Sequence, residues 1–252
     1  MTDLPAKLEK TPLVDAIFEL RFEPCLEAVG DLLPGMLYAA YEGQYSEVES
    51  LPLSRMPRDL RKQDARLTYA AHNQLAGEKN ILRIGDRVVI LSIVRPYPGW
   101  QPFVEDILIL IDKVRETKLI KSPNRFSLRY INVIESKTDN QLSLLNAKIE
   151  VAGEPFSEKG FQLRIEKHQS DFLTILKIIP NTVAQIRKVG ERAGILIDID
   201  TIQEIRGDLF FNKTKECLEG CHEILKKHFF SLLLPETLKS LGPSYEPIRT
   251  TK

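Results

Sequence analysis

Two stretches of the chain carry nearly the same strand pattern, and this repetition constrains the fold more than any other feature. The first stretch contains Phe18-Glu-Leu-Arg-Phe22 and the second contains Phe126-Ser-Leu-Arg-Tyr130. In both, apolar and polar side chains alternate, which is typical of a strand with one wet face. Each stretch is followed, many residues later, by a pair of strand-like segments and then by a long amphipathic helix. We therefore expect a duplicated unit of a strand, antiparallel strands and a long helix.

This duplication defines the fold class that we expect. Hairpin patterns without repeated βαβ units predict an α+β protein, in which a curved antiparallel sheet carries helices on one face. The two units span residues 1–122 and 123–242, and residues 243–252 form a C-terminal tail beside one compact body. A pseudo-twofold axis would relate the units, so that Arg21 and Arg129 become near symmetry mates.

Individual segments give sharper expectations. Asn80–Val94 predicts a hairpin that turns at Gly85-Asp86, because two β-branched runs flank this pair. Apolar residues at helical spacing predict helices over Trp100–Val114 and Lys215–Leu234. Pro34 predicts that a helix within residues 26–41 is short or broken. The remaining expectations are a surface loop over 44–66, a short strand over 67–72, a loop over 180–193 and a strand over 194–202.

Composition limits the classes of partner. Thirty-five basic residues balance thirty-five acidic ones, which removes the electrostatic argument for a nucleic-acid or acidic-membrane partner and makes self-association as a homo-oligomer more plausible. Three cysteines fit a reducing compartment rather than a disulfide framework. The first residues resemble no signal peptide, and charges interrupt the most apolar stretch, Phe103–Val114. We therefore expect a cytoplasmic protein without a membrane partner.

The polar face of the strands is the first candidate site. Charged side chains alternate there with apolar ones, and a curled sheet would gather them in a trough: they are Glu19, Arg21, Arg129, Arg164, Glu166, Asp198 and Asp200. Paired carboxylates can hold a hard cation, and arginines can grip phosphate. The first strand resembles that of triphosphate tunnel enzymes, but Ile17 stands where their pattern has a second carboxylate. The alternative is an ordinary sheet face with cross-strand ion pairs.

An aromatic connector is the second candidate site. Tyr97 and Trp100 lie in Pro96-Tyr-Pro-Gly-Trp100, where prolines stiffen the chain. Aromatic side chains on such a segment make good binding anchors. Trp100 also begins the apolar face of the next helix, so both residues can equally serve in packing.

The cysteines and histidines give little support to metal or cofactor chemistry. Cys217 and Cys221 share a helical face, but His222 points about 100° away from Cys221. We therefore expect buried core thiols rather than a metal site. The sequence also lacks a P-loop, a GxGxxG segment, an HExxH motif and a GxSxG elbow, so we expect no cofactor.

Two basic loops are the remaining candidate. Their cations could contact phosphate backbones, although acidic residues dilute both clusters and no aromatic residue is interleaved; they are Arg55, Arg58, Arg61, Lys62 and Arg66, then Arg187, Lys188 and Arg192. Nucleic-acid binding through these loops is therefore the least favoured of the functions that we weigh.

Three segments together resemble one known family. They are Pro12-Leu-Val-Asp-Ala-Ile-Phe-Glu-Leu-Arg-Phe22, Pro96-Tyr-Pro-Gly-Trp100 and Leu128-Arg-Tyr-Ile-Asn132. The chain is similar to a sporadically distributed family of bacterial and archaeal proteins of comparable length, to which no activity or catalytic residue is assigned. Such a distribution is typical of mobile accessory genes, including defence and toxin–antitoxin components.

The sequence as a whole favours a non-enzymatic binding or interaction protein with a protein or small ligand as partner. The first alternative is a metal-dependent phosphate-handling enzyme, in which Glu19, Asp198 and Asp200 hold the metal and arginines hold phosphate. The second alternative is nucleic-acid binding through the basic loops.

Overall fold

The fold is built around one antiparallel sheet of nine strands in the order β10-β11-β12-β7-β2-β6-β5-β4-β3. A computed structural model describes residues 4–94, 96–155, 160–186, 190–205, 207 and 209–245. The strands of this sheet are β2 (Leu13–Pro24), β3 (Tyr45–Ser50), β4 (Asn73–Gly77), β5 (Asn80–Ile84), β6 (Val88–Ile93), β7 (Ile120–Glu135), β10 (Leu163–Gln169), β11 (Phe172–Ile186) and β12 (Gly190–Glu204). The sheet is not closed, because β10 and β3 are its two edges.

Helices and short elements complete the chain. The helices are α1 (Val29–Ala40), α2 (Arg58–Gln63), α3 (Trp100–Glu116), α4 (Leu209–Leu232) and α5 (Pro235–Ser240). The 3-10 turns are η1 (Pro52–Arg55), η2 (Ala65–Leu67) and η3 (Gln141–Leu144), and the short strands are β1 (Lys7–Leu8), β8 (Glu150–Val151), β9 (Glu154–Pro155) and β13 (Pro243–Ser244). The expected α+β class is therefore confirmed.

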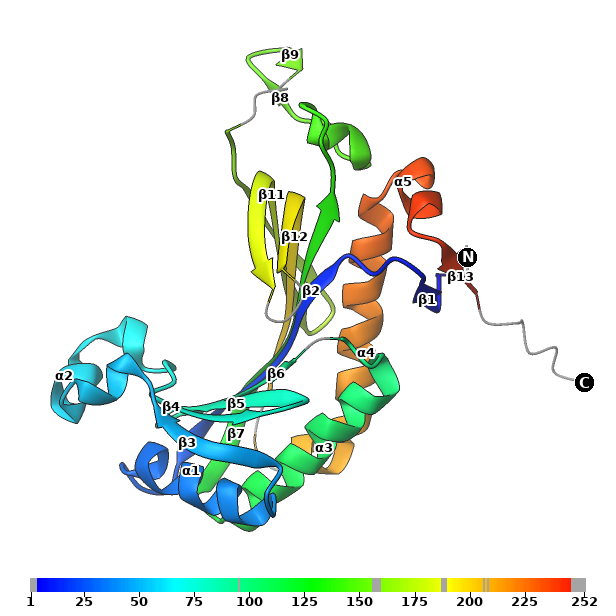
Figure 1. Ribbon diagram of the computed structural model, residues 1–252. Coiled ribbons are helices and arrows are strands. Elements are labelled where there is room, and N and C mark those ends of the chain that lie inside the picture. The colour runs from blue at the N-terminus through cyan, green and yellow to red at the C-terminus, as the bar shows by residue number, and fades with distance from the viewer. Residues whose placement is uncertain are drawn as a thin grey trace, which may run out of the picture.

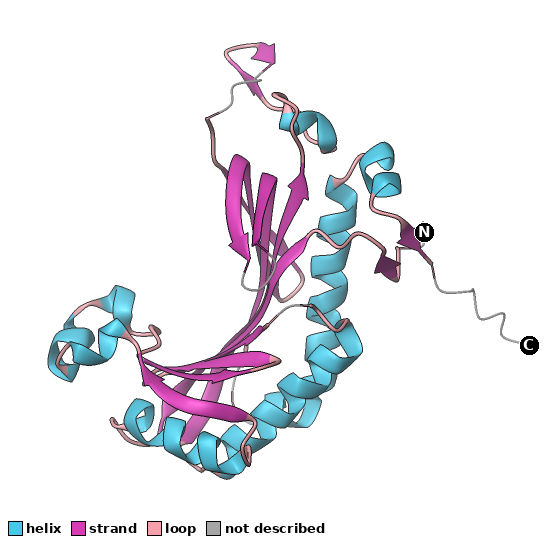
Figure 2. Cartoon of the chain, viewed as in Figure 1, coloured by secondary structure: helices cyan, strands magenta, loops and turns pink. Residues whose placement is uncertain are grey.

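The sheet is strongly curved, and its longer helices lie on the outside of the curve. Figure 1 shows α1, α3 and α4 along the convex side, whereas α2 lies apart, beyond the β3–β4 end. In the colouring of Figure 2 the strands form one bent layer that faces this helical layer on one side only. The opposite, concave side of the sheet is the face to which the charged strand positions belong.

Alternation along the central strands places the core on the convex side. Phe18 and Leu20 of β2, with Phe126 and Leu128 of β7, are at most 1% exposed and pack in one cluster with the helices. The expected helix face of α3 is buried at most of the positions that the sequence indicated, including Phe103, whereas Trp100 and Leu108 are half-buried. Burial of this alternating set fixes the register, because a slip by one residue would turn the apolar side chains to water.

The two echoing runs lie side by side at the centre of the sheet. Register pairs Glu19 with Ser127, Phe18 with Leu128 and Leu20 with Phe126. The nearest two strands on each side of this pair correspond: β6 and β5 follow outward from β2, and β12 and β11 follow outward from β7. Beyond them, β4 and β3 continue the sheet on one side and β10 on the other. The positions of Arg21 and Arg129 correspond in this local arrangement; a common origin of the two halves stays a prediction.

The helix expected within residues 26–41 is shorter than that range, but it is not broken at Pro34. α1 continues through Pro34, which has no N–H to donate to the carbonyl of Gly30. Asn73 Nδ2 donates to that carbonyl over 2.8 Å and replaces the missing helical bond. Gly30 is required here as well, because a Cβ atom would lie 2.4 Å from the buried His72 ring.

Three other expected segments differ from the structure. The expected surface loop over 44–66 contains β3, η1 and α2, and the expected strand over 67–72 is replaced by η2 and a turn that precede β4. The hairpin turns at Asp86-Arg87 rather than Gly85-Asp86, since Gly85 N donates to Val88 O over 2.9 Å. Gly85 is needed for close packing instead, because a Cβ atom there would lie 2.4 Å from Ala70 O.

The expected loop over 180–193 is largely strand. β11 extends to Ile186 and β12 begins at Gly190, so the paired strands form a long hairpin. A register shift between Ile179 and Thr182 interrupts the ladder. Pro180-Asn181, which indicated a turn in the sequence, is therefore a bulge within β11.

Candidate functional site on the concave face

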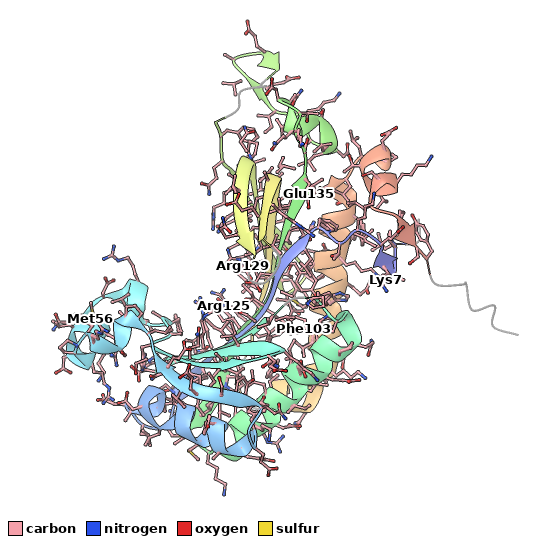
Figure 3. All side chains as sticks on the ribbon, viewed as in Figure 1. Lys7, Met56, Phe103, Arg125, Arg129 and Glu135 are labelled. Atoms are coloured by element: carbon pink, nitrogen blue, oxygen red, sulfur yellow. The ribbon has the colours of Figure 1, made fainter. Side chains whose placement is uncertain are left out.

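Charged side chains from three adjacent strands meet at the centre of the concave face. β2 contributes Glu19 and Arg21, and β12 contributes Asp198 and Asp200. Between them, β7 contributes Arg129 and also Arg125, which lies on the same face. Figure 3 places both β7 arginines on the side of the sheet away from Phe103 and the helices. The curvature of the sheet and the parity of the strands thus bring five of the predicted residues into one area.

Arg129 forms the best-satisfied ion pair of this face. Its Nε and Nη2 atoms donate to the two carboxylate oxygens of Asp198 over 2.7 and 2.8 Å. Lys177 of β11 lies opposite Asp198, and its Nζ is 3.5 Å from Asp198 Oδ2. The hydrogen bond to Asp198 raises the pKa of Arg129 despite its partial burial. A buried carboxylate that is held by two cations is a structural pair and leaves little free charge for a ligand.

Arg21 and Arg125 form a less balanced group. The register places them directly opposite each other on β2 and β7. Arg21 Nε donates to Glu19 Oε1 over 2.6 Å, and Arg125 Nη2 is 3.8 Å from the same oxygen. The Arg21 guanidinium also lies 4.3 Å from the ring centre of Tyr69. Burial, and next the charge of Arg21, lower the pKa of Arg125.

Asp200 differs from Asp198, although both lie on the same face of β12. Burial raises the pKa of Asp200, against a hydrogen bond from Ser127 and the charge of Arg125. Its Oδ1 atom is buried and accepts no hydrogen bond from the described residues. Asp200 is therefore the least satisfied carboxylate among the central residues of the face.

Arg164 and Glu166 remain separate from the central group. Both lie on the edge strand β10, and their side chains pair with each other over 2.5 Å. The register places Arg164 opposite Lys177 of β11. This exposed pair belongs to the rim of the concave face, where an ion pair contributes little to stability.

Tyr97 and Trp100 lie on the convex side, not with the charged residues. Tyr97 Oη is 2.6 Å from Tyr130 Oη, and Trp100 Nε1 donates to Glu219 of α4 over 2.8 Å. The indole ring stacks on His222 with ring centres 3.9 Å apart. Burial, followed by the charge of Lys226, lowers the pKa of His222 to about 3. The packing alternative for the aromatic connector therefore fits these contacts.

The cysteines of α4 also pack rather than converge on a ligand. Cys221 is fully buried and its Sγ lies 3.3 Å from Thr201 O, while Cys217 is half-buried. Over the residues that the structure describes, no three histidine, cysteine, aspartate or glutamate side chains come together as a group that could hold a metal ion. Glu19, Asp198 and Asp200 are part of that described set, and their near neighbours are arginines.

Cations of the first basic loop are mostly engaged by carboxylates. Arg58 pairs with Asp31, the buried Arg61 lies 3.5 Å from Asp86, and Lys62 lies 2.7 Å from Glu27. These pairs connect the η1–α2 segment to the beginning of α1 and to the β5–β6 turn. In the second loop, Arg187 and Lys188 lie outside the described residues, and Arg192 lies 3.0 Å from Glu135.

The sequence prediction missed four contributors to the concave face: Tyr69, Arg125, Ser127 and Lys177. Arg125 was detectable, because it shares the parity of Arg129 along one strand. Lys177 was concealed in an apolar run, and Tyr69 reaches Arg21 from a turn, for which the sequence carries no signal.

Comparison with known proteins gives no family for this chain. No protein-family model matches it, and a search of curated proteins returns no match. Among the described residues, no helix has the length and apolar character needed to cross a membrane.

Proposed function

We propose that the protein is a non-enzymatic binding protein that receives a protein or small ligand on the concave face of its sheet. The observation that carries the proposal is the contrast between the two faces. The convex face is covered by α1, α3 and α4, whereas the concave face presents charged side chains at its centre. A curved sheet of this size offers a broad, pre-formed surface, which lowers the ordering cost of binding.

Site-specific photo-crosslinking tests this proposal. A photoreactive residue is placed at Glu204, which is exposed and lies opposite Arg125 on the concave face, or at Glu166 on the rim. The matched control is Glu223, an exposed position of α4 on the helical side. We expect adducts from the concave positions and none from Glu223 in cells that produce the protein. Equal labelling at all three positions would contradict a dedicated concave surface.

The first alternative is a metal-dependent phosphate-handling enzyme. It draws support from the closeness of Asp200 to arginines on the same face. The engagement of Asp198 by Arg129 and Lys177 speaks against it, because a metal would compete with two cations. Turnover of nucleotides or phosphate esters with Mg²⁺ or Mn²⁺, lost in both Asp198→Ala and Asp200→Ala, would replace the binding proposal by this one.

The second alternative is nucleic-acid binding through the basic loops. Its support is limited, because Arg61 and Lys62 already lie beside carboxylates. Salt-sensitive affinity for DNA or RNA at low ionic strength would favour it, and the absence of binding there would remove it.

The biological setting is a further part of the proposal. We place the chain in the sporadically distributed family on the strength of the Arg129-Tyr130-Ile131-Asn132 strand, and the protein then serves as an accessory component of a mobile defence or toxin–antitoxin locus. A host that carries the gene with its native neighbours should show altered phage plating or growth, and unchanged values for both would count against this setting.

A further inference from the structure

Two guanidinium groups face each other across the centre of the sheet, and both approach the same carboxylate. Arg21 and Arg125 are register partners on β2 and β7, and Glu19 Oε1 is the oxygen that both approach. Like charges placed directly opposite on a sheet are destabilising. Burial is the main cause of the lowered pKa of Arg125, and the charge of Arg21 is the second cause.

Within the part of the chain that the structure describes, few hydrogen-bond donors of this arginine pair meet an acceptor. Each guanidinium carries five N–H donors. Arg21 Nε uses one of them on Glu19, whereas the 3.8 Å separation from Arg125 Nη2 to the same oxygen is too long for a hydrogen bond. Arg125 Nε is buried and has no hydrogen-bond partner among the described residues.

The neighbouring charges limit which anion can compete for these donors. Glu19, Asp200 and Glu204 all act on Arg125, and Arg129 is already engaged by Asp198. A ligand carboxylate has one negative charge and would only equal Glu19. A phosphate monoester carries about 1.5 to 2 negative charges near neutral pH and three acceptor oxygens, so it would displace Glu19 from the arginines.

We propose that Arg21 and Arg125 form a binding site for the phosphate group of a phosphomonoester ligand, with Glu19 as the internal group that this phosphate displaces. Tyr69 lies against the Arg21 guanidinium and holds it in place for two-point contact. The site rests on the proposed binding function and adds the chemistry of the ligand to it. Arg129 is not part of the site, because Asp198 already occupies its bidentate edge.

Titration of the full chain with inorganic phosphate at pH 7.5 and constant ionic strength tests the site. We expect saturable binding by calorimetry that weakens about tenfold or more in Arg125→Gln and in Arg21→Gln, since each variant loses charge-assisted hydrogen bonds. Arg164→Gln is the matched control, because Arg164 also pairs with a glutamate of its own strand on this face. It should bind phosphate within about twofold of the unaltered chain.

Glu19→Gln gives the sharpest arm of the experiment. Removing the internal competitor should tighten phosphate binding about threefold or more, an effect that a merely structural role of Glu19 does not produce. Circular dichroism of each variant separates unfolding from loss of the site. Arg125→Lys should keep the charge but bind more weakly than the unaltered chain, because it cannot form two parallel contacts.

Three results would overturn the site. They are phosphate affinity that is unchanged in Arg125→Gln, an equal loss in Arg164→Gln, and succinate binding as tightly as phosphate, which would assign the site to carboxylates. Crosslinks at Glu204 without phosphate binding would leave the concave binding surface intact and remove only this site. Phosphate binding without crosslinks at Glu204 or Glu166 would leave the phosphate site intact and count against the broader concave binding surface.

Discussion

Arg21 and Arg129 hold corresponding places in two similar strands but meet opposite environments. Across the β2–β7 pair, Arg129 faces Ile17, whereas Arg21 faces Arg125. On the outer side, Arg129 has Asp200 as its register partner on β12, whereas Arg21 has Val88 on β6. The carboxylate that pairs with Arg129 therefore comes from a neighbouring strand, whereas the carboxylate that pairs with Arg21 comes from the same strand as Arg21.

This difference teaches that a repeated sequence pattern fixes where a charge lies but not how well it is neutralised. Asp198 reaches Arg129 from the next strand and meets it with both oxygens. Glu19 lies two positions before Arg21 and offers it one oxygen, which Arg125 also approaches. Arg129 is therefore a structural cation, whereas Arg21 and Arg125 retain hydrogen-bond donors for a ligand.

The largest expected effect follows from breaking the ion pair between Arg129 and Asp198. Asp198→Asn should lower the free energy of unfolding by about 3 kcal/mol, because the nearly buried carboxylate that neutralises Arg129 and Lys177 is lost and the two cations remain beside each other. Urea unfolding followed by circular dichroism measures this loss. A loss below about 1 kcal/mol would show that the pair is only a surface contact.

The matched arginines on β7 give the next effect. Arg129→Gln should lower the free energy of unfolding by about 2 kcal/mol, because Asp198 stays buried with Lys177 as its remaining cation. Arg125→Gln should change it by no more than about 0.5 kcal/mol, since the variant also removes the repulsion with Arg21. Equal losses in the same urea experiment would erase the distinction between the two residues.

The contribution of Asp200 to stability should depend on pH. Because the folded chain raises the pKa of Asp200 above 3.8, it binds more protons than the unfolded chain in the interval above that value. Stability from this group is therefore present at low pH and is lost as the pH rises through the raised pKa. Asp200→Asn lacks this loss, so its stability relative to the unaltered chain should rise between pH 3.5 and 7. Denaturant midpoints at several pH values measure it, and a difference that does not vary with pH would contradict the argument.

The smallest effect concerns the like-charge pair itself. A double-mutant cycle with Arg21→Gln and Arg125→Gln should give an unfavourable coupling of about 0.5 kcal/mol in the folded chain. The cycle should be measured without phosphate and again with it, because a bound dianion would reverse the sign of the coupling. A favourable coupling in the absence of phosphate would contradict the repulsion.

Sequence patterns predicted the parts of the fold that depend on burial along one element. The strand around Phe18, the Asn80–Val94 hairpin and the α3 face are recovered because alternation and helical spacing follow directly from packing on a core. The prediction of a loop over 180–193 was wrong because a Pro-Asn pair is found in β-bulges as well as in turns. Asn181 has a φ of 53°, and its N–H bonds to Gln141, so a contact distant in sequence decides between the two.

The candidate site was predictable only as a set of side chains on one face. Parity identifies Glu19, Arg21 and Arg129, but which carboxylate pairs with which arginine depends on the register between strands far apart in the chain. Arg125 shares the parity of Arg129 along a predicted strand and could have been included in this set. Tyr97 could not be placed, because a connector between a strand and a helix has no parity to read, whereas Trp100 begins α3 and helical spacing already assigned it to the packed face.

The small sheet of β1 and β13 determines how this protein can be handled. Lys7 pairs with Ser244 and Leu8 pairs with Pro243, beside α4 and α5 and away from the concave face. Affinity tags or surface anchors attached through either of these segments would therefore leave the concave face turned toward the solution. A force that pulls the two segments apart would open this two-stranded clasp before it loads the nine-stranded sheet.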